Sequence, residues 1–282
     1  MKSDETARAF AACAPGLEEL VSSELAALGA TGILRCAGGA EFTADPRLVM
    51  RANLHLRTAS RVLLRLAHFP VFHLAQLDRR ARRVDWACFL PLDTPIAVRA
   101  SCKRSKIYHS GAAAERVLKA AIAGARARPA REGEAAIHIS ARIQANQCSL
   151  SLDTSGAPLH QRGAKQEVYA APLRETLAAA FLLLAGFDGT EPLYDPMCGS
   201  GSLAIEGAWI AMQRAPGLLR SFAFERLAGF DRRAWAALED AARRQEVPEA
   251  GAIFASDRAG AAVGTTRRNV QRAGLERVQV TR

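Results

Sequence analysis

An acidic residue followed by a glycine turn stands out in the second half of the chain. The segment Asp195-Pro196-Met197-Cys198-Gly199-Ser200-Gly201 places a carboxylate at the end of a short apolar run, then two glycines, then a helical pattern. Glycines in such a turn let a ligand lie against main-chain amides at the helix N-terminus. The carboxyl ends of parallel strands are the usual place for such a crevice. The segment therefore predicts a small-molecule site.

The acid in the turn narrows the kind of ligand. A single Gly-x-Gly is weak support for a dinucleotide site, and the third glycine of that pattern would fall on Ala204. A carboxylate inside the turn would repel a pyrophosphate, which disfavours a nucleotide-dependent oxidoreductase. It suits a cationic ligand such as S-adenosylmethionine, which carries a sulfonium and an α-amino group.

A second carboxylate follows at the next predicted strand end. Asp257 lies 62 residues after Asp195, and a carboxylate there can accept hydrogen bonds from both ribose hydroxyls of a nucleoside. The alternative role for Asp257 is the N-cap of the helix that follows. The gap between the two acids exceeds a minimal strand–helix–strand unit, so we expect a helical insertion over about residues 213–250.

Alternating patterns in the second half indicate the elements that must position these acids. Apolar runs at 191–195, 251–257 and 278–281 predict strands, and helical spacing covers 171–185, 203–212, 231–246 and 260–273. Strands alternating with helices favour a parallel, doubly wound α/β sheet.

The first half has a different pattern. Strands are expected at 8–14, 32–43, 61–67, 95–101, 135–140 and 147–153, and helices at 17–28, 46–60 and 111–128. This order predicts a small mixed α+β unit that ends near residue 155. The Thr-Ser-Gly-Ala-Pro stretch that follows is typical of a linker.

Positive charge is concentrated in this first half. Of the net charge of +10, residues 1–155 hold a surplus of 8 and residues 156–282 a surplus of 2. The window 79–142 alone contains 14 Lys and Arg against 5 Asp and Glu. Such a cluster is the electrostatic footprint expected for a polyanion, although a solvated basic face would have the same composition.

Several segments together resemble one family, the THUMP-domain class I S-adenosylmethionine-dependent RNA methyltransferases. The quoted segments are Lys103-Arg104-Ser105-Lys106-Ile107-Tyr108-His109-Ser110-Gly111, Leu159-His160-Gln161-Arg162-Gly163, Ala171-Pro172-Leu173-Arg174-Glu175, the glycine turn with its flanks, Ala215-Pro216-Gly217, Phe254-Ala255-Ser256-Asp257 and Arg268-Asn269-Val270. The likeness is strongest to the bacterial 23S rRNA guanine-N2 methyltransferases. It extends over nearly the whole chain.

The resemblance implies a fold class and a domain order. It implies an α+β N-terminal ferredoxin-like/THUMP unit followed by an incomplete α/β Rossmann-like methyltransferase sheet. The expected divisions are a ferredoxin-like segment at 1–44, a THUMP RNA-binding domain at 45–155, a linker at 156–170 and the N-terminal part of the methyltransferase domain at 171–282.

The resemblance also implies site residues. The cofactor would be S-adenosylmethionine, and the partner RNA, 23S rRNA before other RNAs. The residues expected to bind cofactor are Asp195, Pro196, Met197, Gly199, Ser200, Gly201 and Asp257. Those expected to contact RNA are Lys103, Arg104, Lys106, His109 and Arg162, where a solvated loop is the alternative for the first three and a structural role for the last two.

Two departures from the family matter. The family often has a second acid two positions after the strand-end aspartate, where this chain has Ala259. Its Asn/Asp-Pro-Pro-Tyr/Phe loop, which holds the target amine and stacks on the flipped base, is absent, so no catalytic residue is assigned. We therefore expect these 282 residues alone to bind RNA with little or no transfer. The alternatives are an RNA-binding module without catalysis, from a truncated or split gene product, and a tRNA guanine-N2 methyltransferase.

Other classes of protein are disfavoured. The longest strongly apolar run, 176–187, is too short for a membrane span, and the N-terminus lacks the pattern of a secretion signal. A cytoplasmic location without a membrane partner is expected. The six cysteines and six histidines show no metal-ligand spacing, so no zinc or other metal is predicted.

Overall fold

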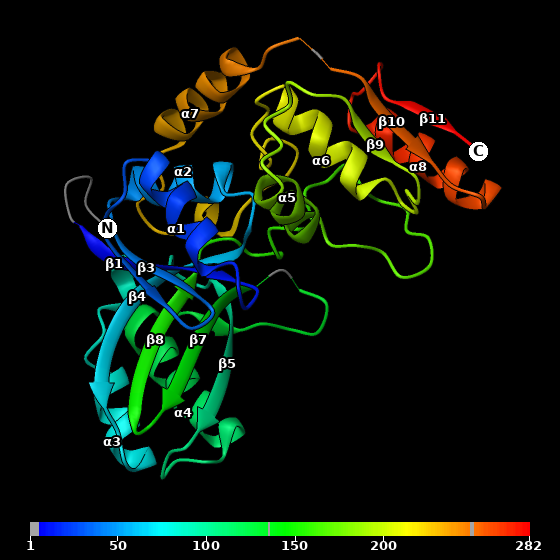
Figure 1. Ribbon diagram of the computed structural model, residues 1–282. Helices are drawn as coiled ribbons and strands as arrows, with labels where there is room; N and C mark the ends of the chain where they lie inside the picture. Colours follow the sequence, from blue (N-terminus) through cyan, green and yellow to red (C-terminus); the bar gives the residue numbers. More distant parts are fainter. Residues whose placement is uncertain (1–5, 135, 249–250) are drawn as a thin grey trace.

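The computed structural model describes residues 6–134, 136–248 and 251–282. It contains an eight-stranded sheet from the first half and a three-stranded sheet from the second (Figure 1). The strands of the large sheet are β1 (Ala7–Cys13), β2 (Thr31–Cys36), β3 (Gly39–Ala44), β4 (Ala59–Pro70), β5 (Pro95–Lys103), β6 (Arg128–Pro129), β7 (Ile137–Gln144) and β8 (Gln147–Asp153). Their order is β2-β3-β1-β4-β8-β7-β5-β6.

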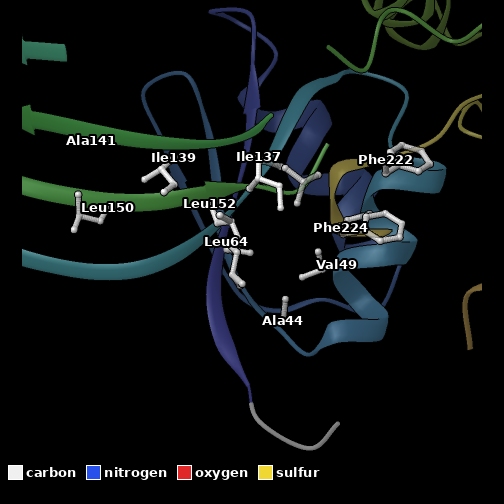
Figure 2. Close-up of a cluster of buried hydrophobic side chains, with 14 of the residues drawn as sticks. Ala44, Val49, Leu64, Ile137, Ile139, Ala141, Leu150, Leu152, Phe222 and Phe224 are labelled. Carbon is white, nitrogen blue, oxygen red and sulfur yellow. The ribbon is translucent and has the colours of Figure 1, made fainter. Parts of the chain in front are cut away.

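One face of this sheet is apolar and covered by helices. Along β7, Ile137, Ile139, Ala141 and Ile143 are buried while the residues between them are not, which is the period-2 alternation of a half-buried strand. The covering helices are α1 (Glu18–Ala27), α2 (Pro46–His55), α3 (Leu74–Ala81), α4 (Ser110–Ala125) and the short turn η1 (Trp86–Cys88). Figure 2 shows the side chains of β4, β7, β8 and α2 meeting in one core.

The three-stranded sheet is parallel. Its strands are β9 (Leu193–Asp195), β10 (Ile253–Ser256) and β11 (Gln279–Thr281), in the order β11-β10-β9. The helices around it are α5 (Glu175–Leu184), α6 (Ser202–Ala211) and α8 (Gly260–Arg272). Trp209 and Ile205 of α6 belong to its core. The predicted alternation of strands and helices is therefore confirmed.

The insertion between β9 and β10 packs away from its own sheet. It contains η2 (Ala223–Arg226) and α7 (Arg232–Gln245), as the gap between the two acids predicted. Phe222, Phe224 and Trp235 form an aromatic cluster, with the Phe224 and Trp235 ring centroids 5.0 Å apart. These rings join the core of the first half (Figure 2). The insertion therefore belongs to the core of the first half, while the three-stranded sheet has a core of its own.

The expected linker after residue 155 is fixed in place. The guanidinium of Arg220, from the insertion, donates hydrogen bonds to the carbonyl oxygens of Ser155, Ala157, Pro158 and Gln161 at 2.6–3.1 Å. A guanidinium presents several donors in one plane, which is why a single side chain can hold a whole loop.

Several local expectations differ from the structure. The helices expected at 171–185 and 46–60 are shorter, at Glu175–Leu184 and Pro46–His55. The segment 32–43 forms the hairpin of β2 and β3 rather than one strand, because Gly38 and Gly39 both have positive φ and turn the chain. The helix α3 was not predicted, since its apolar positions are few and its surface is strongly basic. Within the described residues, no helix is both long and apolar enough to cross a membrane.

Candidate functional site

The two predicted carboxylates meet at the carboxyl ends of neighbouring parallel strands. Asp195 ends β9 and pairs in register with Ala255, so Asp257 follows β10 directly beside it. The glycine turn bridges the strands, since the Cys198 amide donates to the Ser256 carbonyl at 2.9 Å. The Gly199 amide donates to Asp257 Oδ2 at 3.1 Å. Residues 62 positions apart in sequence thus form one site.

Asp257 is not the N-cap of α8, because the helix begins at Gly260 and its N-cap position is Ala259, without a side-chain cap. The Asp257 Oδ1 accepts from the amide of Ala259 at 2.9 Å, directly before α8. The side chain is half-buried and remains on the wall of the cavity described below. The alternative N-cap role is therefore wrong, and this local turn contact leaves Asp257 on the cavity wall.

The two glycines of the turn have different structural roles. Gly199 has φ +54° and Gly201 has φ +83°, both in the left-handed region that favours glycine. A Cβ on Gly201 would lie 2.9 Å from Thr266 Cγ2, whereas a Cβ on Gly199 would have no atom nearer than 4.0 Å. Gly201 allows α6 to pack against α8, and Gly199 leaves open space beside the carboxylates.

A cavity of about 220 Å³ lies against this turn. Five of the seven residues predicted to bind cofactor line it, namely Asp195, Met197, Gly199, Ser200 and Asp257. Pro196 and Gly201 lie in the turn but not on the cavity wall. Ser202 and Leu203 also line it, so the N-terminus of α6, with its unpaired amides, faces the space.

A segment that was expected to be a linker and the start of a helix, with no site residue assigned to it, forms the opposite wall. Residues 163–173, here called the strap, contribute Tyr169 to Leu173 to the lining. The Tyr169 amide donates to Ser200 Oγ at 2.8 Å, and Ser202 Oγ donates to the Leu173 carbonyl at 2.8 Å. No motif of the strap predicts this, because its residues carry no special chemistry. Only the tertiary structure brings them to the turn.

Asn269 of α8 anchors the strap to the glycine turn. Its buried amide nitrogen donates to the carbonyl oxygens of Glu167 and Ser200 at 2.8 and 3.0 Å. Arg268 and Arg272 bind the Glu167 carboxylate at 2.7 and 2.6 Å, and these hydrogen bonds lower the pKa of Glu167 to about 2. The segment Arg268-Asn269-Val270 carried the family resemblance without an assigned role, and in the structure its first two residues hold the strap in place.

The electrostatics of the cavity favour a cation beside Asp195. Only 6% of the Asp195 residue is exposed. Burial raises the pKa of this carboxyl, the Asp257 carboxylate adds to the rise, and the hydrogen bond from the Met197 amide opposes it. A cationic ligand group would relieve both unfavourable effects. The α6 N-terminus beside it suits an anionic group, so the cavity matches a zwitterionic ligand.

Four of the predicted RNA contacts lie together, Lys103 at the end of β5 and the other three on the loop between β5 and α4. Lys103, Arg104, Lys106 and His109 are all exposed. Asn146, in the β7–β8 turn, holds the loop by accepting from the Lys106 amide at 2.8 Å. The Lys106 ammonium lies 5.5 Å from the centroid of the Phe72 ring, and the Tyr108 and His109 rings are 4.4 Å apart. Phe72 was not predicted, since it lies 34 residues from Lys106.

Arg162 lies elsewhere. Only 2% of it is exposed, and its guanidinium binds the buried Glu206 carboxylate of α6 at 2.7 Å and the Arg57 carbonyl at 2.6 Å. We therefore do not propose that Arg162 contacts RNA, because its side chain is enclosed by protein. It instead ties the first half of the chain to the helix that begins at the glycine turn.

No catalytic residue was predicted and none can be assigned from the cavity lining. Among the residues that the structure describes, no group of three or more His, Cys, Asp or Glu side chains could hold a metal ion.

Comparisons with known proteins agree with this architecture. Residues 162–281 match the family model of the RMKL-like methyltransferase domain, and residues 8–63 match that of the RlmL ferredoxin-like domain. The predicted boundary at residue 44 stays a prediction. The predicted fold class, a ferredoxin-like unit followed by a Rossmann-like methyltransferase sheet, is confirmed.

One curated relative is also named as a methyltransferase. A Synechocystis protein named "Putative RNA methyltransferase slr0064" is 34% identical over 243 residues, which are 84% of this chain and 63% of that protein. The chain thus spans less than two thirds of this curated relative.

Two solved structures are each 29% identical. A Listeria monocytogenes protein named a "predicted N6-adenine-specific DNA methylase" has a TM-score of 0.91, over 99% of this chain and 75% of its own. The structure named "SMU.472, a putative methyltransferase complexed with SAH" has a TM-score of 0.88, over 100% of this chain and 76% of its own. The chain is therefore similar over most of its length to a protein named as an RNA methyltransferase and to structures named as a methylase and a methyltransferase, and its two ends match a ferredoxin-like and a methyltransferase domain model.

Proposed function

We propose that the chain binds S-adenosylmethionine in the cavity beside the glycine turn and acts in methyl transfer to RNA. The observation that carries this proposal is the pair of carboxylates, Asp195 and Asp257, at adjacent strand ends around a 220 Å³ cavity. A structure 29% identical to this chain is named as a complex with S-adenosylhomocysteine. The bound cofactor would supply an electrophilic methyl group on its sulfonium.

Different residues of the cavity would bind different parts of the S-adenosylmethionine molecule. Asp257 would accept hydrogen bonds from the ribose hydroxyls, and Asp195 would face the α-amino group or the sulfonium. The amides at the start of α6 suit the carboxylate of the amino-acid part. The strap, through Tyr169 to Leu173, would exclude water from one side.

We propose further that the acceptor is the exocyclic N2 of a guanine in 23S rRNA. This rests on the resemblance of the glycine turn, the Ala215-Pro216-Gly217 segment and the β5–α4 loop to that subgroup. The RNA name of the Synechocystis relative and the exposed cations Lys103, Arg104 and Lys106 support RNA over the DNA substrate in the name of the Listeria protein. Residues 45–155 would act as the THUMP RNA-binding domain.

The chemistry fits a site without a nucleophile. The guanine amine is a poor nucleophile because its lone pair is delocalised into the ring. Rate enhancement must then come from holding the amine and the methyl group in line. No side chain of the described cavity is needed as a covalent catalyst, and Cys198 in the turn is 5% exposed, as a packing residue would be.

Calorimetric titration with S-adenosylhomocysteine tests the cofactor. We expect saturable binding that Asp257→Asn weakens by about ten- to a hundredfold, the cost of weakening hydrogen bonds to a charged acceptor. Asp240→Asn, on the exposed surface of α7, makes the same chemical change far from the cavity and should leave the affinity unchanged. Binding of NAD in place of S-adenosylhomocysteine would overturn the proposal.

The acceptor is tested in cells from which the gene is deleted. Nucleosides from purified 23S rRNA should lack one N2-methylguanine that the wild type has, as measured by mass spectrometry. A methyl group missing from tRNA instead would overturn the rRNA assignment. No missing methyl group in either RNA would overturn the transfer function.

A further inference from the structure

No helix of the described residues packs on the second face of the large sheet. We call this surface the open face. Figure 1 shows α3 and α4 behind the sheet, with β7 and β8 uncovered in front. Its positive side chains include Arg8, Arg65, His68, Arg99, Lys103 and Arg142, with His68 counted only when protonated, while Arg61 on the same face is paired with Asp153.

The strand register places these residues on one surface. Arg99 of β5 pairs with Ser140 of β7, and Arg142 pairs with Ser101 on one side and Ser149 on the other. Paired residues point to the same face of a sheet. His68 Nδ1 lies 2.9 Å from the Ser149 hydroxyl, which extends the surface onto β4.

Side-chain contacts among β4, β3 and β1 extend the open face toward the edge of the sheet. The Arg65 guanidinium donates to the Ser151 hydroxyl at 2.9 Å and to Glu41 at 3.1 Å. Arg8 binds the other oxygen of Glu41 at 3.3 Å. A hollow of about 490 Å³ lies over Arg8, Arg65 and His68.

The charge of this face is not balanced within the chain. Among the described residues, no carboxylate lies within ion-pair distance of Arg99, Lys103 or Arg142, all of which are exposed. Arg142 donates only to the neutral side chain of Gln144, at 2.7 Å. The internal structure does not require these cations, because the core lies on the other face. They are available to an anionic partner.

The side chains between the cations indicate which form of RNA fits. Among the described residues of this face, the one Phe, Tyr or Trp ring is Phe10, which is 5% exposed and lies under the Arg65 guanidinium, 4.7 Å from it. Of the histidines on this face, His138 is partly buried and His68 is exposed. Successive unpaired bases need several exposed rings to stack on, and His68 supplies only one. Cations interspersed with the hydroxyls of Ser101, Ser140 and Ser149 suit phosphates and 2′-hydroxyls, the groups by which an RNA duplex is bound.

We propose that the open face docks the sugar-phosphate backbone of double-stranded RNA. The proposal rests on the proposed function, that the substrate is RNA, and adds where its duplex part lies. The β5–α4 loop, with Tyr108 and His109 exposed at the end of the same strands, then faces unpaired nucleotides beyond the duplex.

Fluorescence anisotropy of the full chain with two probes tests this. The probes are a 20-base-pair RNA duplex and the single strand of the same sequence, each titrated at several salt concentrations. The double variant Arg99→Gln/Arg142→Gln should weaken duplex binding by roughly tenfold. It should also lower the slope of log K against log salt by about 2, one for each lost phosphate contact.

A matched control removes the same charge from the helix-covered side. Arg79→Gln/Arg116→Gln changes two exposed arginines of α3 and α4 and should leave duplex affinity within about twofold of the wild type. Unchanged binding of S-adenosylhomocysteine shows that both variants are folded.

The outcomes separate the two proposals. Equal losses in both double variants would mean that net charge alone acts, and would overturn the docking face. Wild-type duplex affinity in Arg99→Gln/Arg142→Gln would also overturn it, while RNA binding itself, and so the proposed function, would stand. A wild-type chain that binds neither probe would overturn the RNA substrate and the docking face together.

Discussion

Gly201 is the residue at which the geometry of the glycine turn makes its sharpest prediction. In Gly201→Ala, the left-handed backbone costs about 1–2 kcal/mol. The new Cβ lies 2.9 Å from Thr266 Cγ2, so the threonine must leave its rotamer at a cost of about 1 kcal/mol. That movement also disrupts the hydrogen bond from Thr266 Oγ1 to the Gly199 carbonyl, 3.0 Å long and worth about 1 kcal/mol.

A matched substitution separates backbone strain from the clash. Gly199→Ala meets no atom nearer than 4.0 Å at its Cβ, so it costs only the left-handed backbone. Both alanines recover about 0.5–1 kcal/mol by restricting the unfolded chain. We therefore expect a loss of about 3 kcal/mol for Gly201→Ala and about 1 kcal/mol for Gly199→Ala.

Urea unfolding measured by tryptophan fluorescence checks these values, because Trp209 is buried in α6. Thr266→Ser removes the clashing methyl group and keeps the hydroxyl. In the double variant it should restore about 1 kcal/mol of the loss caused by Gly201→Ala, as a favourable coupling energy. Equal losses for the two alanines, or no coupling with Thr266→Ser, would refute the reasoning.

Three further substitutions have expected outcomes. Because the pKa of Asp195 is raised, its ionisation opposes folding as the pH rises through that pKa. At pH 7, Asp195→Asn should therefore unfold at a higher urea concentration than the wild type, and this difference should shrink as the pH falls toward about 4. The variant should also lose affinity for S-adenosylhomocysteine. A lower stability of the variant at pH 7 would contradict this reasoning. Glu206→Gln leaves Arg162 buried without a carboxylate and should cost about 3–5 kcal/mol in urea unfolding, and a loss below 1 kcal/mol would show that the pair is dispensable. Arg220→Lys cannot serve four carbonyls and should cost about 2 kcal/mol, with faster amide exchange confined to residues 155–161; unchanged exchange there would contradict the assigned role.

Much of the fold could be predicted because its signals are local. The alternation of Ile137, Ile139 and Ala141 depends only on the period of a strand, and the acid–glycine–helix order around Gly199 depends on backbone conformations that few other residues adopt. The same local logic placed Asp257 at a strand end. Because a parallel sheet was expected, the carboxyl ends of both strands had to lie at the same edge, which brings Asp257 close to Asp195.

What could not be predicted depends on contacts between segments far apart in the chain. The basic character of Arg162 suggested RNA, but the buried Glu206, 44 residues away, makes it an internal ion pair. The strap became a cavity wall through its contacts with Asn269, Ser200 and Ser202. The insertion joined the first half through the packing of Phe224. Each of these outcomes was decided by which surfaces met after folding.

The sequence by itself therefore determined the elements, their order and the chemistry of the glycine turn, because turns, periods and strand ends are properties of short segments. Only the tertiary structure decided which cations are exposed. Arg99, Arg142 and Arg162 are chemically alike in the sequence, yet two lie on the open face of the sheet and one is enclosed between the two halves of the chain. The reason is physical: burial and charge pairing depend on the distance between groups in space, which the chain order does not set.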